Sequence, residues 1–221
     1  MRINIAIDGP SAAGKSTIAK MLAARLGYVH MDTGAMYRCT AFKALNEGIS
    51  LEDEPQVVAM LDRTDIKLTP DGKVFLDGVD VSGVIRTNEI SMGASKVSAL
   101  KEVRAKLVAL QQEMAKDKGI IMDGRDIGTV VLKDAEVKVF MTASAEARAM
   151  RRYLENQEKG IPSDLEALTK EIEKRDYDDS HREHSPLRKA EDAIELDSSD
   201  LTIDEVVARM IDIMNEKGYQ V

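Results

Sequence analysis

Apolar and polar positions divide the chain into two kinds of segment that alternate. Short apolar or β-branched runs predict strands at residues 3–7, 28–32, 120–123, 137–142 and 193–197. Between them lie longer segments in which apolar residues recur at helical spacing, as at Ile18, Met21, Leu22 and Leu26. Because strands that alternate with crossover helices form parallel sheets, we predict an α/β fold with a five-stranded parallel sheet. Helices should cover both of its faces, and ligands should bind at the carboxyl ends of its strands.

Several helix boundaries are marked in the sequence. A long helix that ends at Gly119 carries one apolar stripe, made of Leu100, Val103, Leu107, Leu110 and Met114. Two charged helices follow later, one over about residues 145–159 and one from Ser163, joined by the hinge-like loop NQEKGIPS. Ser163 and Thr202 each precede a glutamate by three residues, which is capping-box spacing and predicts a helix start at both.

One segment breaks this alternation. Residues 65–84 alternate apolar and polar positions around two turn sequences, Pro70-Asp71-Gly72 and Asp77-Gly78, and so predict a small antiparallel meander. We interpret residues 63–94 as an insert in a single domain over residues 1–221, because this length fits one domain with an insertion better than two domains.

The composition of the chain argues against some classes of function. The hydrophobic fraction of 43% and the charged fraction of 32% are those of a globular protein. A formal net charge of −8 argues against non-specific nucleic-acid binding, so we expect no nucleic-acid partner. No apolar stretch reaches the roughly 20 residues of a membrane helix, and the N-terminal run is too short for a signal peptide. Together with a lone cysteine, Cys39, which we expect to be a buried thiol, these features predict a cytoplasmic protein without membrane contact.

The strongest chemical signal is the stretch GPSAAGKST at residues 9–17. It satisfies G-x-x-x-x-G-K-[ST] directly after a predicted strand and at the start of a predicted helix. In such a loop the backbone N–H groups point at phosphate oxygens, a lysine reaches the β- and γ-phosphates, and the next hydroxyl can ligate magnesium. We therefore predict Ser16 as a Mg²⁺ ligand and a nucleoside triphosphate site made of Gly9, Pro10, Ser11, Ala12, Ala13, Gly14, Lys15, Ser16 and Thr17.

Nucleotide binding alone leaves the reaction open. The chain has no N-K-x-D sequence to read guanine, and the run IIMD, the nearest candidate for the metal-binding acid of a mechanical ATPase, soon continues with Arg125. Phosphate transfer between two anions needs cations around both, and Arg38 and Arg125 stand near predicted carboxyl ends of strands. For Arg148 alone, a solvated position on a charged helix is the favoured interpretation.

Six motifs together resemble the bacterial cytidylate kinase family. They are IDGPSAAGKST, DTGAMYR, VSGVIRTNEIS, DGRDIGTVV, RDYDDSHR with SPL beyond it, and LDSS, and the resemblance covers about residues 5–207. The family implies a P-loop nucleoside monophosphate kinase with a three-layer core around a five-stranded parallel sheet. It also implies a monophosphate-binding part enlarged by a small antiparallel insert, and a mobile helical lid, here within residues 148–182.

The resemblance implies a site for CMP or dCMP made of Thr33, Arg38, Ser95, Arg104, Arg125, Asp126, Arg175 and Asp179. Three of them, Thr33, Arg38 and Arg125, would hold the acceptor phosphate, and Arg175 and Asp179 would meet the ribose. The cytosine would be read by Ser95, Arg104 and Asp126, since an arginine donates to O2 and N3 while a carboxylate and a hydroxyl accept from the exocyclic amine. Spacing alone favours a helix start for Ser95 and a structural carboxylate for Asp126.

By the same resemblance, catalysis would depend on five cations, Lys15, Arg125, Arg151, Arg152 and Arg182. Arg151 and Arg152 match lid arginines that close over ATP and the transferring group. The expected reaction moves the γ-phosphoryl group of ATP, bound with Mg²⁺, to CMP or dCMP in pyrimidine metabolism, and the chain should act as a monomer. Two alternatives stay open: a P-loop kinase for another small acceptor, and a regulatory module that binds nucleotide without turnover.

Overall fold

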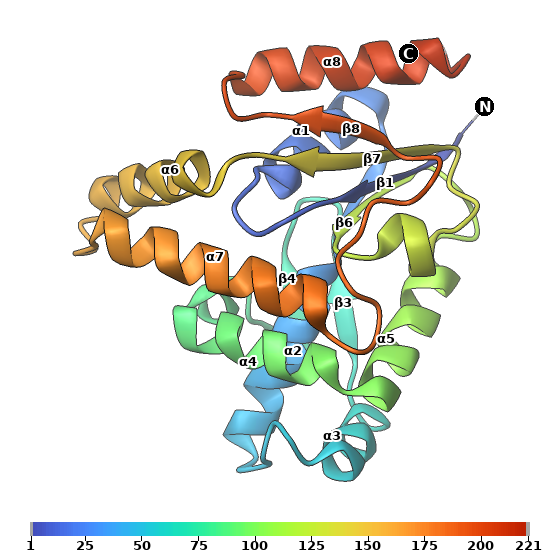
Figure 1. Cartoon of the computed structure of the whole chain (residues 1–221). Coiled ribbons are helices and arrows are strands. Elements are labelled where there is room, and N and C mark those ends of the chain that lie inside the picture. Colours follow the sequence, from blue (N-terminus) through green and yellow to red (C-terminus); the bar gives the residue numbers. More distant parts are fainter. Residues whose placement is uncertain (1, 220–221) are drawn as a thin grey trace.

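A parallel sheet forms the centre of the computed structural model, which describes residues 2–219 (Figure 1). Its strands are β1 (Asn4–Asp8), β2 (Val29–Asp32), β6 (Ile120–Gly124), β7 (Val137–Thr142) and β8 (Ile194–Asp197). They pair in the order β2-β6-β1-β7-β8, all in parallel. The predicted five-stranded parallel sheet is therefore confirmed. The strands β1 and β6 are buried over their whole length, as expected where helices cover both faces.

Helices pack on both faces of this sheet and make three layers. On one face, α1 (Lys15–Leu26) and α8 (Ile203–Glu216) bring Leu22 and Met210 into a cluster with Ile5 and Ile7 of β1. On the other face, a second cluster joins Ala6 of β1 to α5 (Lys101–Met114) and to a helical turn at Ile127–Val131. Burial of apolar side chains on both faces fixes the central strands, whose carboxyl ends then become a rigid platform.

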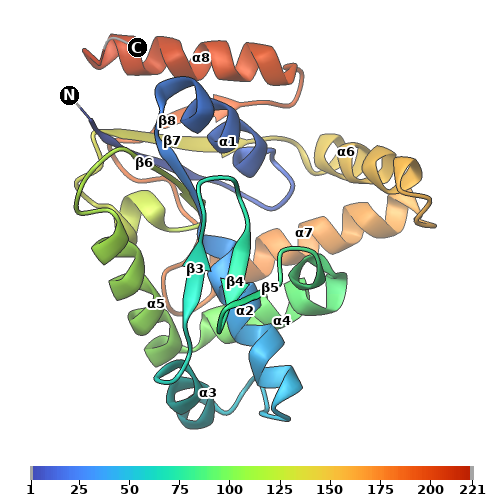
Figure 2. The same ribbon diagram turned by 180° about the vertical axis from the view of Figure 1, so that it is seen from behind.

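Beyond those carboxyl ends, a second group of elements forms its own core. Three helices, α2 (Thr33–Asn46), α3 (Glu54–Leu61) and α4 (Asn88–Ala99), pack with α5 around Met36, Val57 and Leu107. The strands β3 (Ile66–Leu68), β4 (Val74–Leu76) and β5 (Val79–Asp80) form the predicted antiparallel meander beside α2 (Figure 2). A short 3-10 helix (Val84–Arg86) follows, and the proposed insert boundary at residue 94 falls inside α4. Cys39 is buried in α2, and this burial raises the pKa of its thiol to about 12.

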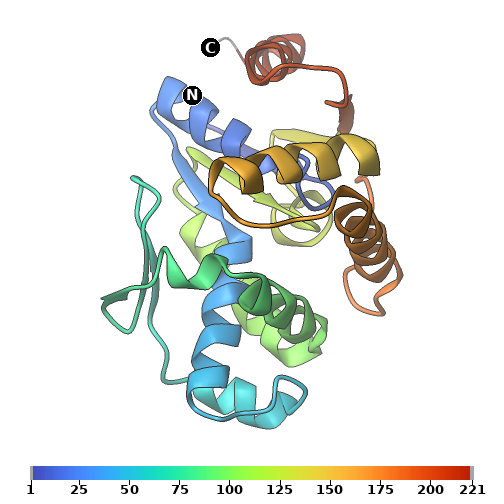
Figure 3. The same ribbon diagram turned by 90° about the vertical axis from the view of Figure 1, so that its left-hand side faces the viewer.

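The helices α6 (Ala145–Glu158) and α7 (Leu165–His181) lie side by side at the edge of the molecule (Figure 3). α6 buries Arg148 and Ala149, but Met150 and Leu154 remain about half exposed. Few buried apolar contacts are typical of elements that can move as a unit. None of the helices within residues 2–219 is long and apolar enough to cross a membrane.

Two helix boundaries differ from the predictions. The long helix expected through Leu100 is two helices, because Leu100 adopts an extended conformation (φ −74°, ψ 122°) between α4 and α5. The bend lets Val97 and Val103 enter the same cluster, whereas Leu110 is 50% exposed and does not belong to the stripe.

The capping box expected at Ser163 is wrong. Asp164 caps α7 instead, and its carboxylate accepts a hydrogen bond from the Ala167 N–H at 2.8 Å. A carboxylate at the helix N-terminus accepts a charge-assisted bond, so it competes well with the preceding hydroxyl. The capping box expected at Thr202 and Glu205 is confirmed.

Gly9, the first residue after β1, is the position in the fold least tolerant of a side chain. Its φ is 151°, and a Cβ would lie 2.0 Å from the carbonyl oxygen of Met141 on the neighbouring strand. We expect Gly9→Ala to lower the free energy of unfolding by at least about 3 kcal/mol, because backbone strain and overlap with the backbone of β7 add. Chemical denaturation measures this loss.

Gly27→Ala is the matched control for that substitution. Gly27 also has a positive φ, 64°, but a Cβ there meets nothing within 4 Å. In Gly27→Ala, backbone strain alone should lower the free energy of unfolding by about 1–2 kcal/mol. Equal losses for the two variants would contradict the close approach of Gly9 to β7.

Candidate active site

The carboxyl ends of all five strands of the sheet meet at one cavity of about 540 Å³. The P-loop follows β1, Thr33 follows β2, Arg125 follows β6, and Ser198 follows β8, while α6 begins just beyond β7. Open parallel sheets bind ligands at this edge, and the volume is that of a small-molecule site. Of the predicted site residues, Gly9 and Pro10 do not line the cavity, and all the others do.

Charge distinguishes this cavity from the rest of the chain. Eight cationic side chains line it, namely Lys15, Arg38, Arg104, Arg125, Arg151, Arg152, Arg175 and Arg182. The carboxylates that line it number five, so an excess of positive charge collects here in a protein whose net charge is −8. Such a concentration of cations is suited to polyanionic ligands.

Several of these arginines keep buried donors free of protein partners. Within residues 2–219, the buried Nε atoms of Arg38, Arg104 and Arg175 and the buried Nη2 atom of Arg182 have no hydrogen-bond acceptor. A buried unpaired donor costs free energy, and the cost is recovered when a ligand supplies the acceptor. These guanidinium groups are therefore candidates for holding anionic or carbonyl oxygens.

The P-loop opens directly into α1. Gly14 caps this helix with φ 89°, and the helix N-terminus that follows lines the cavity. Lys15 in the first turn is 5% exposed, and its Nζ donates to the Pro10 carbonyl oxygen at 2.5 Å. Burial, together with the nearby Arg125 guanidinium, lowers the pKa of Lys15 to about 7.

This pKa predicts proton uptake when a nucleotide binds. With a pKa of about 7, Lys15 is mostly neutral at a pH of about 8, and a polyphosphate beside it favours the charged form. Binding of ATP should then take up roughly 0.9 proton at this pH and weaken as pH rises, because the bound state holds more protons than the free state. Calorimetry in buffers of different ionisation enthalpy measures the uptake. Lys15→Met should abolish it, and uptake that persists in this variant would contradict the assignment to Lys15.

Ser16 and Asp123 form the candidate metal site. Ser16 Oγ donates to Asp123 Oδ2 at 2.7 Å, and Asp123 lies near the end of β6. Hydroxyl and carboxylate oxygens are ligands that Mg²⁺ accepts, and P-loop NTPases hold Mg²⁺ with this kind of pair. The described residues contain no cluster of three or more His, Cys, Asp or Glu side chains that could hold an ion alone. The pair therefore fits an ion that is also bound by nucleotide phosphates.

Three of the predicted phosphate ligands are held in place by neighbouring acceptors. Thr33 Oγ1 donates to the Asp123 carbonyl oxygen at 2.8 Å, and Arg38 Nη2 donates to Asp32 Oδ2 at 2.7 Å. Arg125 Nε donates to Asp179 Oδ2 at 2.8 Å, which ties the end of β6 to α7. The cations thus meet at the cavity in defined orientations.

Arg104 and Asp126 form a buried ion pair that lines the same cavity. Arg104 Nη2 and Asp126 Oδ2 are 2.5 Å apart, and each side chain is 6% exposed. Arg104 Nη1 donates to the Ser98 carbonyl oxygen, and its guanidinium lies 5.5 Å from the centre of the Tyr37 ring. Ser95 lies within α4 and lines the same cavity, so it is not the helix start that spacing favoured.

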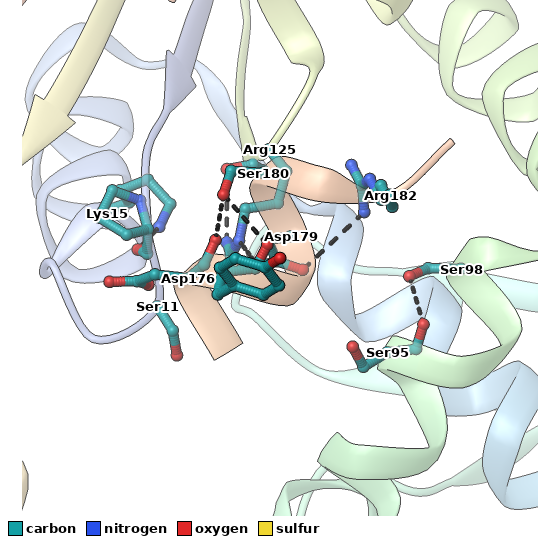
Figure 4. Close-up of polar contacts among 12 residues, drawn as sticks. Ser11, Lys15, Ser95, Ser98, Arg125, Asp176, Asp179, Ser180 and Arg182 are labelled. Atoms are coloured by element: carbon teal, nitrogen blue, oxygen red, sulfur yellow. Dashed lines mark hydrogen bonds and ion pairs between the residues drawn. The ribbon is translucent and has the colours of Figure 1, made fainter. Parts of the chain in front are cut away.

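In the view of Figure 4, Asp179 of α7 lies between Lys15 and Ser95. Asp179 pairs with Arg125, and Arg182 Nη1 approaches it at 4.0 Å. Burial opposes ionisation of Asp179, but these cations hold its pKa below the usual value. Arg175 is on the same helix and lines the cavity as well. The carboxylate therefore remains charged and orients the arginines around it.

Arg148 differs most from its prediction, because it is buried rather than solvated. It is 4% exposed, and its guanidinium forms a bidentate pair with Asp176. The Nε atom donates to the Ala143 carbonyl oxygen, and Nη1 donates to the Ser11 carbonyl oxygen at 3.0 Å. Arg148 therefore connects the P-loop to both α6 and α7. Hydrophobic spacing on one helix could not reveal these acceptors.

The two remaining arginines of α6 both line the cavity. Arg151 donates to the carbonyl oxygen and the hydroxyl of Ser198, in the loop after β8. In this structure Arg151 therefore lies at the side of the cavity that is lined by Ser198 and Leu201. Arg152 lines the cavity from the same helix.

Sequence reasoning missed two acids at this site, Asp32 and Asp123. Asp32 is the N-cap of α2 and pairs with Arg38, and Asp123 accepts from Ser16. Each stands at or next to the carboxyl end of a predicted strand. That position is the signal in the sequence that points to them, although Arg125, two residues after Asp123, is not expected after the metal-binding acid of a mechanical ATPase.

Comparison with known proteins decides the family. The family model described as cytidylate kinase matches residues 5–216. The chain belongs to the cytidylate kinase family. A protein of Caldicellulosiruptor bescii named cytidylate kinase is 55% identical to this chain, over 96% of it and 95% of the relative. Another of that name from Lactobacillus gasseri is 54% identical, over 97% and 95% of the two chains.

Solved structures agree with the fold of this cytidylate kinase family member. A gluconokinase from Sinorhizobium meliloti superposes with a TM-score of 0.50 at 15% identity, over 97% of this chain and 93% of the other. A shikimate kinase from Bacteroides thetaiotaomicron gives a TM-score of 0.50 at 12% identity, over 97% and 99%. At such identities the likeness concerns the fold alone, a P-loop kinase fold. All six motifs that resemble cytidylate kinases contribute lining residues to the cavity.

Proposed function

We propose that this protein transfers the γ-phosphoryl group of ATP to CMP or dCMP and releases ADP with CDP or dCDP. The single observation that carries the proposal is the cavity itself. It contains both a P-loop and the buried pair Arg104 and Asp126, and eight cationic side chains line it. A site for two anions that meet at their phosphates needs this arrangement.

The donor would lie along the P-loop, with its phosphates on the N–H groups of residues 9–17 and on Lys15. Mg²⁺ would be held by Ser16 and, directly or through water, by Asp123, and when bound it would neutralise charge on the phosphates. The support is the hydrogen bond of 2.7 Å between these two side chains.

The acceptor would lie against α2, α4 and α5. Its phosphate would meet Thr33, Arg38 and Arg125, and its ribose Arg175 and Asp179. Arg104 would donate to O2 and N3 of cytosine, while Asp126 and Ser95 would accept from the exocyclic amine. The free Nε of Arg104 supports this role, because the ion pair with Asp126 leaves a donor for the base.

The chemical step needs no general base. An oxygen of the CMP phosphate is already anionic, so it can attack the γ-phosphorus as the bond to the β-phosphate oxygen of ATP breaks. Lys15, Arg125 and Arg182 would stabilise the charge on the three transferring oxygens. Arg151 and Arg152 would complete the site when the lid, within residues 148–182, closes and excludes water.

The working unit would be the single chain, because one chain supplies the P-loop, the pair Arg104 and Asp126 and the cations of the cavity. With free nucleotides as substrates, we expect the reaction to take place in the cytoplasm.

A comparison of acceptors tests the proposed function. ADP release should be measured with ATP, Mg²⁺ and, separately, CMP, dCMP, UMP, AMP, GMP and dTMP, beside a reaction without acceptor. We expect rapid turnover with CMP and dCMP and much slower turnover with the others. A preference for AMP or dTMP would favour a kinase for another acceptor. Turnover that no acceptor increases would favour a module that only binds nucleotide.

A further inference from the structure

His30 is a buried histidine that lies outside all six motifs. It lies on β2, the edge strand of the parallel sheet, and is 7% exposed. Its Nε2 atom is 2.6 Å from Oδ1 of Asp123 on the neighbouring strand β6. Asp123 is itself 4% exposed, so this hydrogen bond is formed away from bulk water. Buried polar contacts of this kind have strong orientational preferences.

The two oxygens of Asp123 have different partners. Oδ1 is bound to His30, and Oδ2 accepts the hydrogen bond from Ser16. A carboxylate that is held at both oxygens cannot rotate without losing a hydrogen bond. The chain of contacts therefore runs from His30 through Asp123 to the P-loop hydroxyl that we propose as a Mg²⁺ ligand.

His30 cannot touch the nucleotide itself. It does not line the 540 Å³ cavity, although Asp123 and Ser16 do. It lines instead a hollow of about 10 Å³ between α1 and the small sheet, together with Lys20, Thr69 and Lys73. Any effect of His30 on the reaction must therefore pass through Asp123.

We propose that His30 is a positioning residue for the magnesium site and fixes the carboxylate of Asp123 in the orientation that binds the ion. This inference rests on the proposed function, in particular on Mg²⁺ at Ser16 and Asp123. Hydrogen-bond partners that orient metal ligands typically change metal affinity about 10- to 100-fold. His30 should contribute to the binding of Mg-nucleotide and contribute little to the binding of nucleotide without metal.

The test measures the effect of the metal on nucleotide affinity. Calorimetry gives the dissociation constant of β,γ-methylene-ATP once in excess MgCl₂ and once in EDTA. The constant in EDTA divided by the constant in MgCl₂ measures how much the metal strengthens nucleotide binding. We expect His30→Leu to reduce this ratio about 10-fold and to leave the constant in EDTA unchanged. His30→Gln, whose amide can donate to Oδ1, should restore most of the ratio. If His30→Leu does not fold, His30→Asn replaces it, because its shorter amide falls short of Asp123.

Tyr28→Phe is the matched control for a lost hydrogen bond near the same strand. The Tyr28 hydroxyl accepts from the Ile3 N–H at 3.1 Å and makes no hydrogen bond to His30 or Asp123. This variant should lower the melting temperature and keep the parent ratio. If His30→Leu has the same ratio as the unsubstituted protein, even with a lowered melting temperature, then His30 is merely structural and the proposal is overturned.

Asp123→Asn tests the metal site separately from the role of His30. It should reduce the ratio at least as much as His30→Leu. An unchanged ratio in Asp123→Asn would overturn the metal site, and the role of His30 with it, whereas the acceptor comparison would still decide the proposed kinase activity. A reduced ratio in Asp123→Asn with a parent ratio in His30→Leu would overturn the role of His30 alone.

Discussion

Replacing Lys15 with alanine is expected to lower kcat about 1,000-fold. Lys15 is buried at the end of the P-loop, so no solvent ion can substitute for its charge beside the γ-phosphate. Removing one preorganised group that stabilises transition-state charge typically costs about 100- to 1,000-fold, and a charged one acts at the upper end. Steady-state kinetics at saturating ATP and CMP measures the loss.

Lys20→Ala is the control for that experiment. Lys20 lies on the same helix, is exposed, and does not line the 540 Å³ cavity. Its removal should change kcat less than about 2-fold, in line with surface charges away from a site. A kcat that survives in Lys15→Ala would exclude this side chain from the proposed mechanism.

Replacing Asp126 with asparagine is expected to change which base the enzyme accepts. Since one oxygen of Asp126 pairs with Arg104, only the other can accept from the exocyclic amine of cytosine, and asparagine replaces that oxygen with an NH2 group that can donate to O4 of uracil. We expect kcat/KM for CMP to fall about 100-fold or more, and the ratio of UMP to CMP use to rise by a similar factor. The KM for ATP should remain close to that of the parent, because Asp126 is not among the residues that we propose to bind ATP.

Asparagine serves this test better than alanine. Both substitutions remove the charge that is paired with the buried Arg104, but the amide oxygen of asparagine can still accept a hydrogen bond from this guanidinium, whereas alanine offers no acceptor. The control is Asp134→Asn, because Asp134 is exposed and, like Asp126, lies between β6 and β7. This variant should change neither base preference nor melting temperature. Parallel losses with CMP and UMP in Asp126→Asn would contradict a role in reading the base.

Local signals in the sequence were sufficient for much of the fold. The alternation of short apolar runs with helical spacing predicted the five parallel strands, and two turn sequences predicted the small meander between Asp65 and Val84. Both are patterns of neighbouring residues, which burial on two faces and tight turns impose directly. The P-loop was readable for the same reason, since its spacing, strand and helix are contiguous.

Features that depend on a competition between neighbouring residues, or on contacts between residues far apart in the sequence, were not predictable in this way. The N-cap of α7 shifted by one residue to Asp164, a local competition that the spacing of Ser163 does not settle. Arg148 finds its acceptors on Ser11 and Asp176, which lie far away in the sequence. The pairs of Asp123 with His30 and of Arg104 with Asp126 likewise arise only when the sheet and the helices are assembled. The roles we gave to Arg104 and Asp126 came from family resemblance rather than from spacing.

The central claim is that the γ-phosphoryl group of ATP moves to the phosphate of CMP, and following that group is the most direct test. The purified protein is mixed with Mg²⁺, CMP and ATP that carries a radioactive γ-phosphate, and the products are separated within a few turnovers. We expect the label to appear in CDP and unlabelled ADP to form in equal amount. Label released as inorganic phosphate, or label that remains in ATP when CMP is present, would contradict the claim.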